Sequence, residues 1–277
     1  DRMEFPTEDP QTTLDKVRAW FLEKEYDSIG VATFGPVDAN TASSTYGYIT
    51  DTPKPGWGHT DVLGLLGLRA ETKPVRFDTD VNAPAMAELG VLRAKNPAIT
   101  ITSCAYVTVG TGIGVGLVVN GDSIKGLMHP EAGHIYVPPM DGDTFKGNCP
   151  FHGACLEGMC ATPALSSRTG LPASELATLS DDDPLWEYVA HQLAHLCLTL
   201  VLTASPEHIS LGGGVMNRTC LFPKIRKKFT SLLNGYVASK QLLPGSTDGL
   251  ESYISGSVLG PSAGLIGACY LAKVALG

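Results

Sequence analysis

Segments with helical and strand character alternate through the first third of the chain, and this alternation sets the class of fold. Apolar side chains recur there at helical spacing, separated by short apolar runs typical of buried strands. Helices are expected at residues 12–25, 61–68 and 83–95, and strands at residues 28–34 and 75–78. Helices that alternate with short strands favour a mostly parallel sheet covered by helices. We therefore predict an α/β fold.

The pattern changes near Pro97. Consecutive antiparallel strands are expected at residues 99–109, 114–120 and 122–126, the last two joined by a tight turn at Asn120-Gly121. Further on, helices are expected at residues 185–204, from about 222 and at 261–276, and a strand at residues 208–211. We predict two lobes, residues 1–98 and 99–260, with the last helix, residues 261–277, packing back on the first lobe.

Composition excludes several classes of protein. Hydrophobic residues make up 43% of the chain and charged residues 17%, which is typical of a globular protein. The net charge of −8 disfavours a nucleic-acid partner, because affinity for the phosphate backbone comes from clustered Lys and Arg. No apolar run reaches the about 20 residues needed to cross a bilayer, so no membrane partner is expected. Seven unevenly spaced cysteines and no signal peptide indicate a cytoplasmic protein.

Two glycine-rich segments are candidate phosphate sites. Gly110, Thr111 and Gly112 are followed by a strand, whereas a dinucleotide fingerprint needs a helix there. This segment is either a plain hairpin turn or a turn whose successive N–H groups hold a phosphate. Gly212, Gly213 and Gly214 follow a strand and precede a helix, so they form either a crossover loop or a close approach to a nucleotide.

The most specific local pattern is a set of metal ligands. Cys149, His152 and Cys155 stand at three-residue spacing in a loop, and His134 can supply a fourth ligand. Zinc in structural sites prefers four sulfur and nitrogen ligands. Because four protein ligands leave no open position, the sequence predicts a structural Zn²⁺ rather than a catalytic one.

Three carboxylates are candidates for chemistry. Asp80 stands between an expected strand and an expected helix, where it is either a helix cap or a general base at the carboxyl end of a strand. Glu131 and Glu157 flank the metal loop, and folding of that loop could point both into one cleft. Carboxylates with a neighbouring Asn suit a polyhydroxylated ligand, since each can accept hydroxyl hydrogen bonds.

Taken in order, these segments resemble the motif series of the ROK sugar kinases across nearly the whole chain. The Cys-x-x-His-x-x-Cys form of the metal loop, with Thr79 before Asp80, is similar to the bacterial fructokinase branch. The segments that carry the resemblance are Phe34–Asp38, Thr52–Trp57, Thr79–Asn82, Gly110–Gly112, His129–His134, Cys149–Gly158, Leu211–Val215 and Gly264–Gly267.

The resemblance implies an actin-like (ribonuclease H-like) two-lobe fold with the active site in the cleft. It implies a homodimeric enzyme that phosphorylates a hexose with ATP and Mg²⁺, fructose to fructose 6-phosphate, with Asp80 as the general base. The sugar would contact Gly35, Pro36, Asn82, Glu131, His134 and Glu157. ATP would lie against Gly110, Thr111, Gly112, Gly212, Gly213 and Gly214. Structural Zn²⁺ would be held by His134, Cys149, His152 and Cys155.

Two departures from the family pattern bear on this expectation. Relatives specific for aldohexoses commonly carry Asn before the base, where this chain has Thr79, and this favours fructose. Family members also open with a hairpin containing an Asp-or-Glu-x-Gly-Gly-Thr-Lys-like turn that holds ATP phosphates, and we find no such segment before Ser28. The alternative to an active kinase is therefore a sugar-binding pseudokinase or an inactive fragment of such a kinase.

Overall fold

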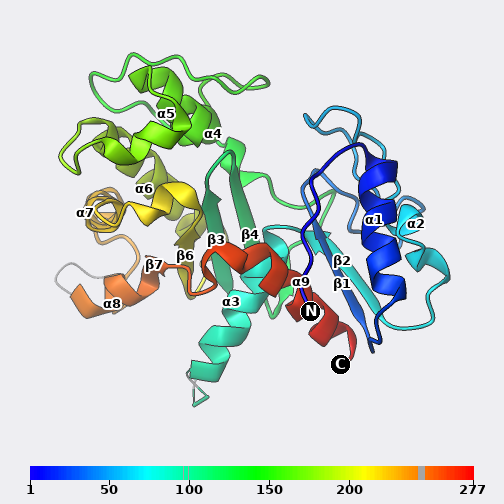
Figure 1. Cartoon of the computed structure of the whole chain (residues 1–277). Coiled ribbons are helices and arrows are strands. Elements are labelled where there is room, and N and C mark those ends of the chain that lie inside the picture. The colour runs from blue at the N-terminus through cyan, green and yellow to red at the C-terminus, as the bar shows by residue number, and fades with distance from the viewer. Residues whose placement is uncertain (96, 99, 243–246) are drawn as a thin grey trace.

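The computed structural model describes residues 1–95, 97–98, 100–242 and 247–277 and shows two lobes (Figure 1). One lobe is built on a two-stranded sheet and the other on a five-stranded sheet. The helices of the described residues are α1 (Pro10–Leu22), α2 (Val62–Leu65), α3 (Asn82–Lys95), α4 (Leu156–Cys160), α5 (Thr162–Thr169), α6 (Leu185–Ala204), α7 (Leu221–Leu233), α8 (Thr247–Tyr253) and α9 (Ala263–Ala275). The strands are β1 (Ile29–Thr33), β2 (Val75–Thr79), β3 (Cys104–Val109), β4 (Ile113–Val119), β5 (Asp122–Ser123), β6 (Ile209–Gly212) and β7 (Ile254–Gly256).

The smaller lobe pairs β1 with β2 in parallel, so both strands end at the same edge. Helix α1 begins with Pro10 after Asp9, whose carboxylate accepts a hydrogen bond from the Thr12 N–H at 2.9 Å. The strands and helices of this lobe bury one apolar core, which consists of Leu14, Val37, Ala39, Ile49, Trp57, Val62, Leu63 and Phe77. The parallel pairing brings the segments after Thr33 and Thr79 side by side.

The larger lobe has strand order β5-β4-β3-β6-β7. Strands β3, β6 and β7 are parallel, and β4 runs antiparallel to both of its neighbours. Successive side chains of a strand point to opposite faces. Accordingly, Ala105 and Val107 of β3 join a core with α6 and α7, whereas Cys104 and Tyr106 join a core with α3 and α9. The sheet is thus covered by helices on both faces.

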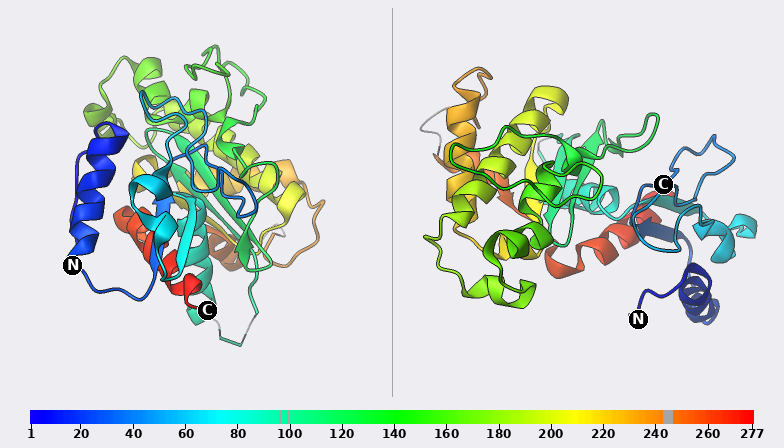
Figure 2. Two further views of the ribbon diagram at one scale, coloured as in Figure 1. Left: turned by 90° about the vertical axis from the view of Figure 1, so that its right-hand side faces the viewer. Right: turned by 90° about the horizontal axis from the view of Figure 1, so that it is seen from above.

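Helices α3 and α9 lie where the two lobes meet (Figure 2). Helix α9 contacts β1 and β2 on one side and α3 on the other. Glycines permit this packing, since a Cβ on Gly30 would come within 1.9 Å of the Ala268 carbonyl oxygen, and one on Gly267 within 2.5 Å of the Pro84 nitrogen. Helix α3 belongs to the first predicted lobe, residues 1–98, but packs on the sheet of the larger lobe. The division of the chain at residue 98 stays a prediction.

Several expected elements have different bounds in the structure. The strand predicted for residues 99–109 begins at Cys104, and its expected first residue lies outside the described residues. The helix predicted for residues 61–68 ends at Leu65, because Gly67 adopts a left-handed φ of 76° and starts a separate 3-10 turn. The strand predicted for residues 122–126 has two residues, although the Asn120-Gly121 turn before it is confirmed, with φ of 55° and 84°. Among the described residues, none of the helices has the length and apolar character to span a bilayer.

Candidate functional site

The candidate site lies where strands of both sheets end. Gly35 and Pro36 follow β1, and Asp80 follows β2. In the other lobe, the turn containing Gly110 joins β3 to β4, and Gly213 follows the parallel strand β6. The carboxyl ends of parallel strands are the usual place for ligands in open α/β sheets.

Asp80 occupies the turn between β2 and α3. Its N–H donates to the Thr33 carbonyl oxygen at 2.8 Å, which ties this turn to the end of β1. The first turn of α3 is capped by Thr79, whose Oγ1 accepts from the Asn82 N–H at 2.9 Å. The Thr79 hydroxyl therefore caps α3, and the Asp80 carboxylate lies at the surface of the turn between β2 and α3.

The electrostatic surroundings of Asp80 favour its neutral form. Asp80 is exposed as a residue, but the protein around its carboxylate displaces much of the water there. This burial raises the pKa of Asp80 above its ordinary value, against smaller opposing effects from its own backbone N–H and the charge of Lys54. A carboxyl with a raised pKa is suited to accept a proton near neutral pH.

Glu131 and Glu157 share the electrostatic environment of Asp80. Although the Glu131 side chain is 44% exposed, the protein packed around its carboxylate displaces water and raises its pKa to about 7, and the negative charges of Glu157 and Asp80 add to this rise. Glu157 accepts a hydrogen bond at 3.0 Å from the Ile113 N–H, at the tip of the β3–β4 hairpin. The structure therefore brings the three predicted carboxylates into one region from three separate segments.

Asn82, unlike Asp80 and Glu131, is a buried residue. Its side chain is 1% exposed, its amide donates to Asp78 Oδ1 at 2.8 Å, and its Oδ1 accepts from the Leu117 N–H at 3.3 Å. Asp78 is fully buried and also accepts from the Ser123 hydroxyl at 2.6 Å, while Lys125 Nζ lies 3.5 Å away. The role of Asn82 as a sugar contact stays a prediction. Sequence reasoning missed this network, because its partners come from segments far apart in the chain.

The two glycine segments lie next to each other. A Cβ on Gly110 would be 3.9 Å from the Gly214 nitrogen. Gly213 has a left-handed φ of 89°, and a Cβ there would come within 2.4 Å of the Val109 carbonyl oxygen, so only glycine fits. Within the hairpin tip, the Gly110 N–H donates to the Gly112 carbonyl oxygen at 2.9 Å. Two turns that are about 100 residues apart in sequence thus form one backbone surface.

A pocket of about 600 Å³ opens beside Gly214. Its wall includes the Arg218 guanidinium, which lies 4.4 Å from the ring centroid of Trp186 and forms an ion pair with Asp181. The lining residues are Thr162, Leu165, Ala173, Leu176, Ala177, Asp181, Trp186, Gly214, Val215, Asn217, Arg218 and Thr219. Sequence reasoning assigned a binding role to Gly214 alone among these, although Asn217 and Arg218 stand only three and four residues after it.

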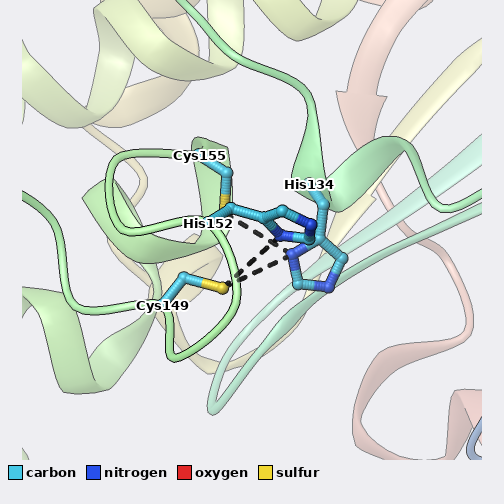
Figure 3. A group of neighbouring side chains, drawn as sticks. All are labelled: His134, Cys149, His152 and Cys155. Carbon is cyan, nitrogen blue, oxygen red and sulfur yellow. Dashed lines mark hydrogen bonds between the residues drawn. The ribbon is translucent and has the colours of Figure 1, made fainter. Parts of the chain in front are cut away.

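His134, Cys149, His152 and Cys155 converge as the spacing predicts (Figure 3). Cys149 Sγ lies 3.8 Å from His134 Nδ1 and 3.7 Å from His152 Nδ1, and Cys155 Sγ lies 3.5 Å from His134 Nδ1. Sulfur and nitrogen ligands of one tetrahedral zinc ion are about 3.4–3.8 Å apart. Burial raises the pKa of Cys155 to about 11, so its thiolate form needs a compensating cation. The donor set and its geometry fit zinc.

The metal-ligand loop is connected to the carboxylates. Cys155 precedes α4, and Glu157 lies in the first turn of that helix. The Leu156 N–H donates to the Ile135 carbonyl oxygen at 2.8 Å, and the His134 N–H donates to the Glu131 carbonyl oxygen at 3.0 Å. Each of the two glutamates is therefore fixed to the loop that carries the four ligands.

Comparison with known proteins agrees with this site. The model of the ROK family matches residues 1–275. The chain is 41% identical to a putative fructokinase of Bacillus subtilis over 277 residues, covering 100% of this chain and 88% of that protein. It is 39% identical to a fructokinase of Pediococcus pentosaceus over 276 residues, covering 100% of this chain and 90% of that protein.

Solved structures share the fold. The crystal structure of a ROK hexokinase from Thermus thermophilus superposes with a TM-score of 0.74 at 24% identity, covering 99% of this chain and 90% of that chain. This agreement confirms the two-lobe fold expected from the motifs. The family model and the relatives in sequence together show that the chain belongs to the ROK family, among its sugar kinases.

Proposed function

We propose that the protein transfers the γ-phosphoryl group of ATP to fructose, forming fructose 6-phosphate, with Asp80 as the general base. The observation that carries this proposal is the convergence of Asp80, Glu131 and Glu157 beside the two glycine turns, with a pKa of Asp80 raised by burial. The fructokinases among its relatives, aligned over the whole chain, support fructose as the substrate.

The proposed roles follow from the chemistry of each group. Asp80 would take the proton of the C6 hydroxyl as that oxygen attacks the γ-phosphorus. Glu131 and Glu157 would accept hydrogen bonds from the other sugar hydroxyls, with His134, Asn82 and the Gly35-Pro36 turn completing the sugar site. When bound with ATP, Mg²⁺ supplies charge neutralisation of the phosphates.

The nucleotide has a proposed place next to the sugar. Backbone N–H groups of the Gly110–Gly112 and Gly212–Gly214 turns, apart from the Gly110 N–H that donates within the hairpin, are suited to hold phosphate oxygens, because glycine lets the backbone approach them closely. The pocket beside Gly214 is of a size and polarity that suit an adenosine group, with Trp186 and Arg218 on its wall. Phosphoryl transfer then depends chiefly on positioning the two ligands across the cleft.

The four Cys and His ligands are proposed to hold a structural zinc ion. The site has four protein ligands, and two of them, Cys149 and Cys155, are buried. A closed four-ligand site leaves no position for a substrate. Its proposed contribution is therefore to fold the loop that fixes Glu131 and Glu157.

The direct test is release of ADP from MgATP with fructose, compared with glucose, mannose and N-acetylmannosamine. We expect kcat/KM to be highest for fructose, and we expect nuclear magnetic resonance of the product to place the phosphate on C6. A higher kcat/KM for any of the other three sugars would overturn the assignment of fructose. No release with any sugar would overturn the kinase activity of this chain.

A further inference from the structure

His129 has no part in the roles proposed so far, yet its imidazole joins the two lobes at the site. Its side chain is only 3% exposed. Nε2 accepts a hydrogen bond from the Val37 N–H at 3.1 Å, directly after the Gly35-Pro36 turn. On the other side of the ring, Nδ1 lies 3.5 Å from Glu131 Oε1 and 3.4 Å from the Pro130 carbonyl oxygen.

These contacts define the protonation state of the ring. Because Nε2 accepts the Val37 N–H, the neutral ring carries its proton on Nδ1, the nitrogen that faces Glu131. Burial lowers the pKa of His129, against smaller opposing effects from the Pro130 carbonyl and the charge of Asp78. The imidazole thus accepts a hydrogen bond from Val37 of the smaller lobe and presents its Nδ1–H to Glu131 of the larger lobe.

Close packing adds to these hydrogen bonds. A Cβ on Gly35 would lie 3.1 Å from both Cε1 and Nε2 of His129, closer than an ordinary contact. Gly35 does not have a left-handed φ, so its backbone conformation by itself allows other residues. A Cβ at this position would therefore require the ring to shift by a few tenths of an ångström.

We propose that His129 is a positioning residue that sets the Gly35-Pro36-Val37 turn and the Glu131 carboxylate relative to each other. Both of these belong to the sugar side of the cleft, so the inference rests on the proposed function. A loss of His129 should weaken sugar binding through both walls of the site. His129 is not among the residues that line the pocket at Gly214, so the nucleotide side should keep its affinity.

The first test compares His129→Leu, which removes both nitrogens, with His129→Gln, whose amide oxygen can still accept the Val37 N–H. We expect His129→Leu to raise the KM and Kd of fructose about tenfold, because a buried N–H loses its acceptor. The KM of ATP should stay within about twofold of wild type, and His129→Gln should recover most of the affinity for fructose. Fructose Kd is followed by calorimetry, so that binding is measured without turnover.

His208→Gln is the matched control. His208 is also a largely buried histidine, with Nε2 bonded to the Ser210 hydroxyl at 3.0 Å, but it directly precedes β6, at the opposite end of that strand from Gly212. This variant should lose stability without changing the fructose Kd. If His129→Leu raised the KM of fructose and the KM of ATP by equal factors, the ring would be a general packing residue and the inference would be wrong. The same would follow if the fructose Kd of His129→Gln were no lower than that of His129→Leu.

A double-variant test isolates the packing of the ring on the turn. Gly35→Ala should raise the fructose Kd about threefold in the wild-type background, since the new methyl group must displace the ring. In a His129→Ala background the same change should have a clearly smaller effect, because the ring atoms at 3.1 Å are gone and only the Val37 nitrogen at 3.4 Å remains close to the new Cβ. Equal effects in both backgrounds would contradict the inference.

Fructose binding without ADP release would contradict the proposed function alone, and wild-type protein that binds no fructose would overturn both.

Discussion

The three carboxylates of the proposed sugar site differ in how the protein compensates their charge. Glu157 has the Ile113 N–H as a donor, whereas the protein around Glu131 displaces water from its carboxylate, which also faces the like charges of the other two and has a pKa of about 7. Asp80 lies within the field of Lys54, a residue of the smaller lobe. Differences of this kind assign different roles to chemically similar groups, because a base must be able to take up a proton.

Lys54 gives a test of the pKa of Asp80. Its ammonium lies 4.4 Å from the Phe34 ring centroid, and its charge lowers the pKa of Asp80 against the effect of burial. Lys54→Met should raise that pKa, because it removes a positive charge near the carboxylate. Since the proposed turnover needs the carboxylate form of Asp80, the acidic limb of the kcat profile should shift to higher pH. Lys24→Met, which removes an ammonium 5.1 Å from the Trp20 ring centroid, is the matched control and should leave the profile unchanged. An unshifted limb in Lys54→Met would show that Asp80 does not control the profile.

The raised pKa of Asp80 also predicts an effect on stability. A carboxyl with a higher pKa in the folded state than in the unfolded state lowers stability once it ionises. The loss sets in as pH rises from the ordinary Asp value of 3.8 through the raised value. Asp80→Asn should therefore raise Tm at pH 7 and leave it nearly unchanged at about pH 3.

Asp38→Asn serves as the opposite control. Against the cost of burial, hydrogen bonds from Ser43 and Thr45 lower the pKa of Asp38. Its charge therefore contributes stability above the ordinary Asp pKa, and that contribution is lost as pH falls through the lowered value. Thermal unfolding of Asp38→Asn at pH 7 should give a lower Tm. A fall in Tm for both variants would contradict the electrostatic account of Asp80.

At the scale of single elements, the metal loop makes the strongest prediction. Purified protein should hold about one zinc ion per chain, as measured by mass spectrometry of the metal, and Cys149→Ser should lose most of it. Loss of zinc should lower Tm and fructose affinity together, since Glu131 and Glu157 are fixed to this loop. Cys269→Ser changes an exposed cysteine of α9 and should alter neither. Metal-free protein with unchanged Tm would refute the structural role.

The glycine turn after β6 gives a prediction for the nucleotide side. Gly213→Ala places a Cβ within 2.4 Å of the Val109 carbonyl oxygen and strains a left-handed φ of 89°. We expect the KM of ATP to rise by about tenfold or more, with the fructose Kd unchanged. Gly170→Ala strains a similar φ of 73° at the end of α5, where a Cβ meets no atom within 4 Å, so it should lower Tm alone. An equal KM of ATP in both variants would remove the Gly213 turn from the nucleotide site.

Local signals predicted some elements and missed others. The metal ligands and the Asn120-Gly121 turn were predictable because their signals lie within a few residues of sequence, with only His134 more distant. Strand β7 has three residues, too few to show a period, and α4 follows the metal loop without a run of helical periodicity. Gly67 divides the second helix because of its left-handed backbone, which the apolar spacing around it does not reveal.

Contacts between distant segments were the part of the site that sequence could not supply. Asp78 and Ser123 are 45 residues apart, and His129 and Val37 are 92 apart, so each bond depends on how the lobes pack. The resemblance to a family named Asp80 and the glutamates as site residues. His129 and Lys54 lie in segments that carry the resemblance, but it assigned neither of them a role. Tertiary packing decides which of many polar side chains are enclosed in the site.

For the whole molecule, helix α9 is the main connection between the lobes. It packs on β1, β2 and α3, and the Ser28 hydroxyl donates to the Ala272 carbonyl oxygen at 2.7 Å (Figure 1). Movement of the lobes relative to each other would therefore have to be accommodated at α9 and its neighbours. The homodimer stays a prediction, and light scattering of the purified chain tests it.

In the proposed reaction, Asp80 removes a proton from fructose as the phosphoryl group is transferred from ATP. The most direct measurement is the rate of fructose 6-phosphate formation by wild type and Asp80→Asn, each at a fructose concentration that saturates its measured Kd. We predict a loss of kcat of at least about a hundredfold, with the fructose Kd within about tenfold, because the change removes a base more than a binding group. Wild-type kcat in Asp80→Asn would show that Asp80 is not the base.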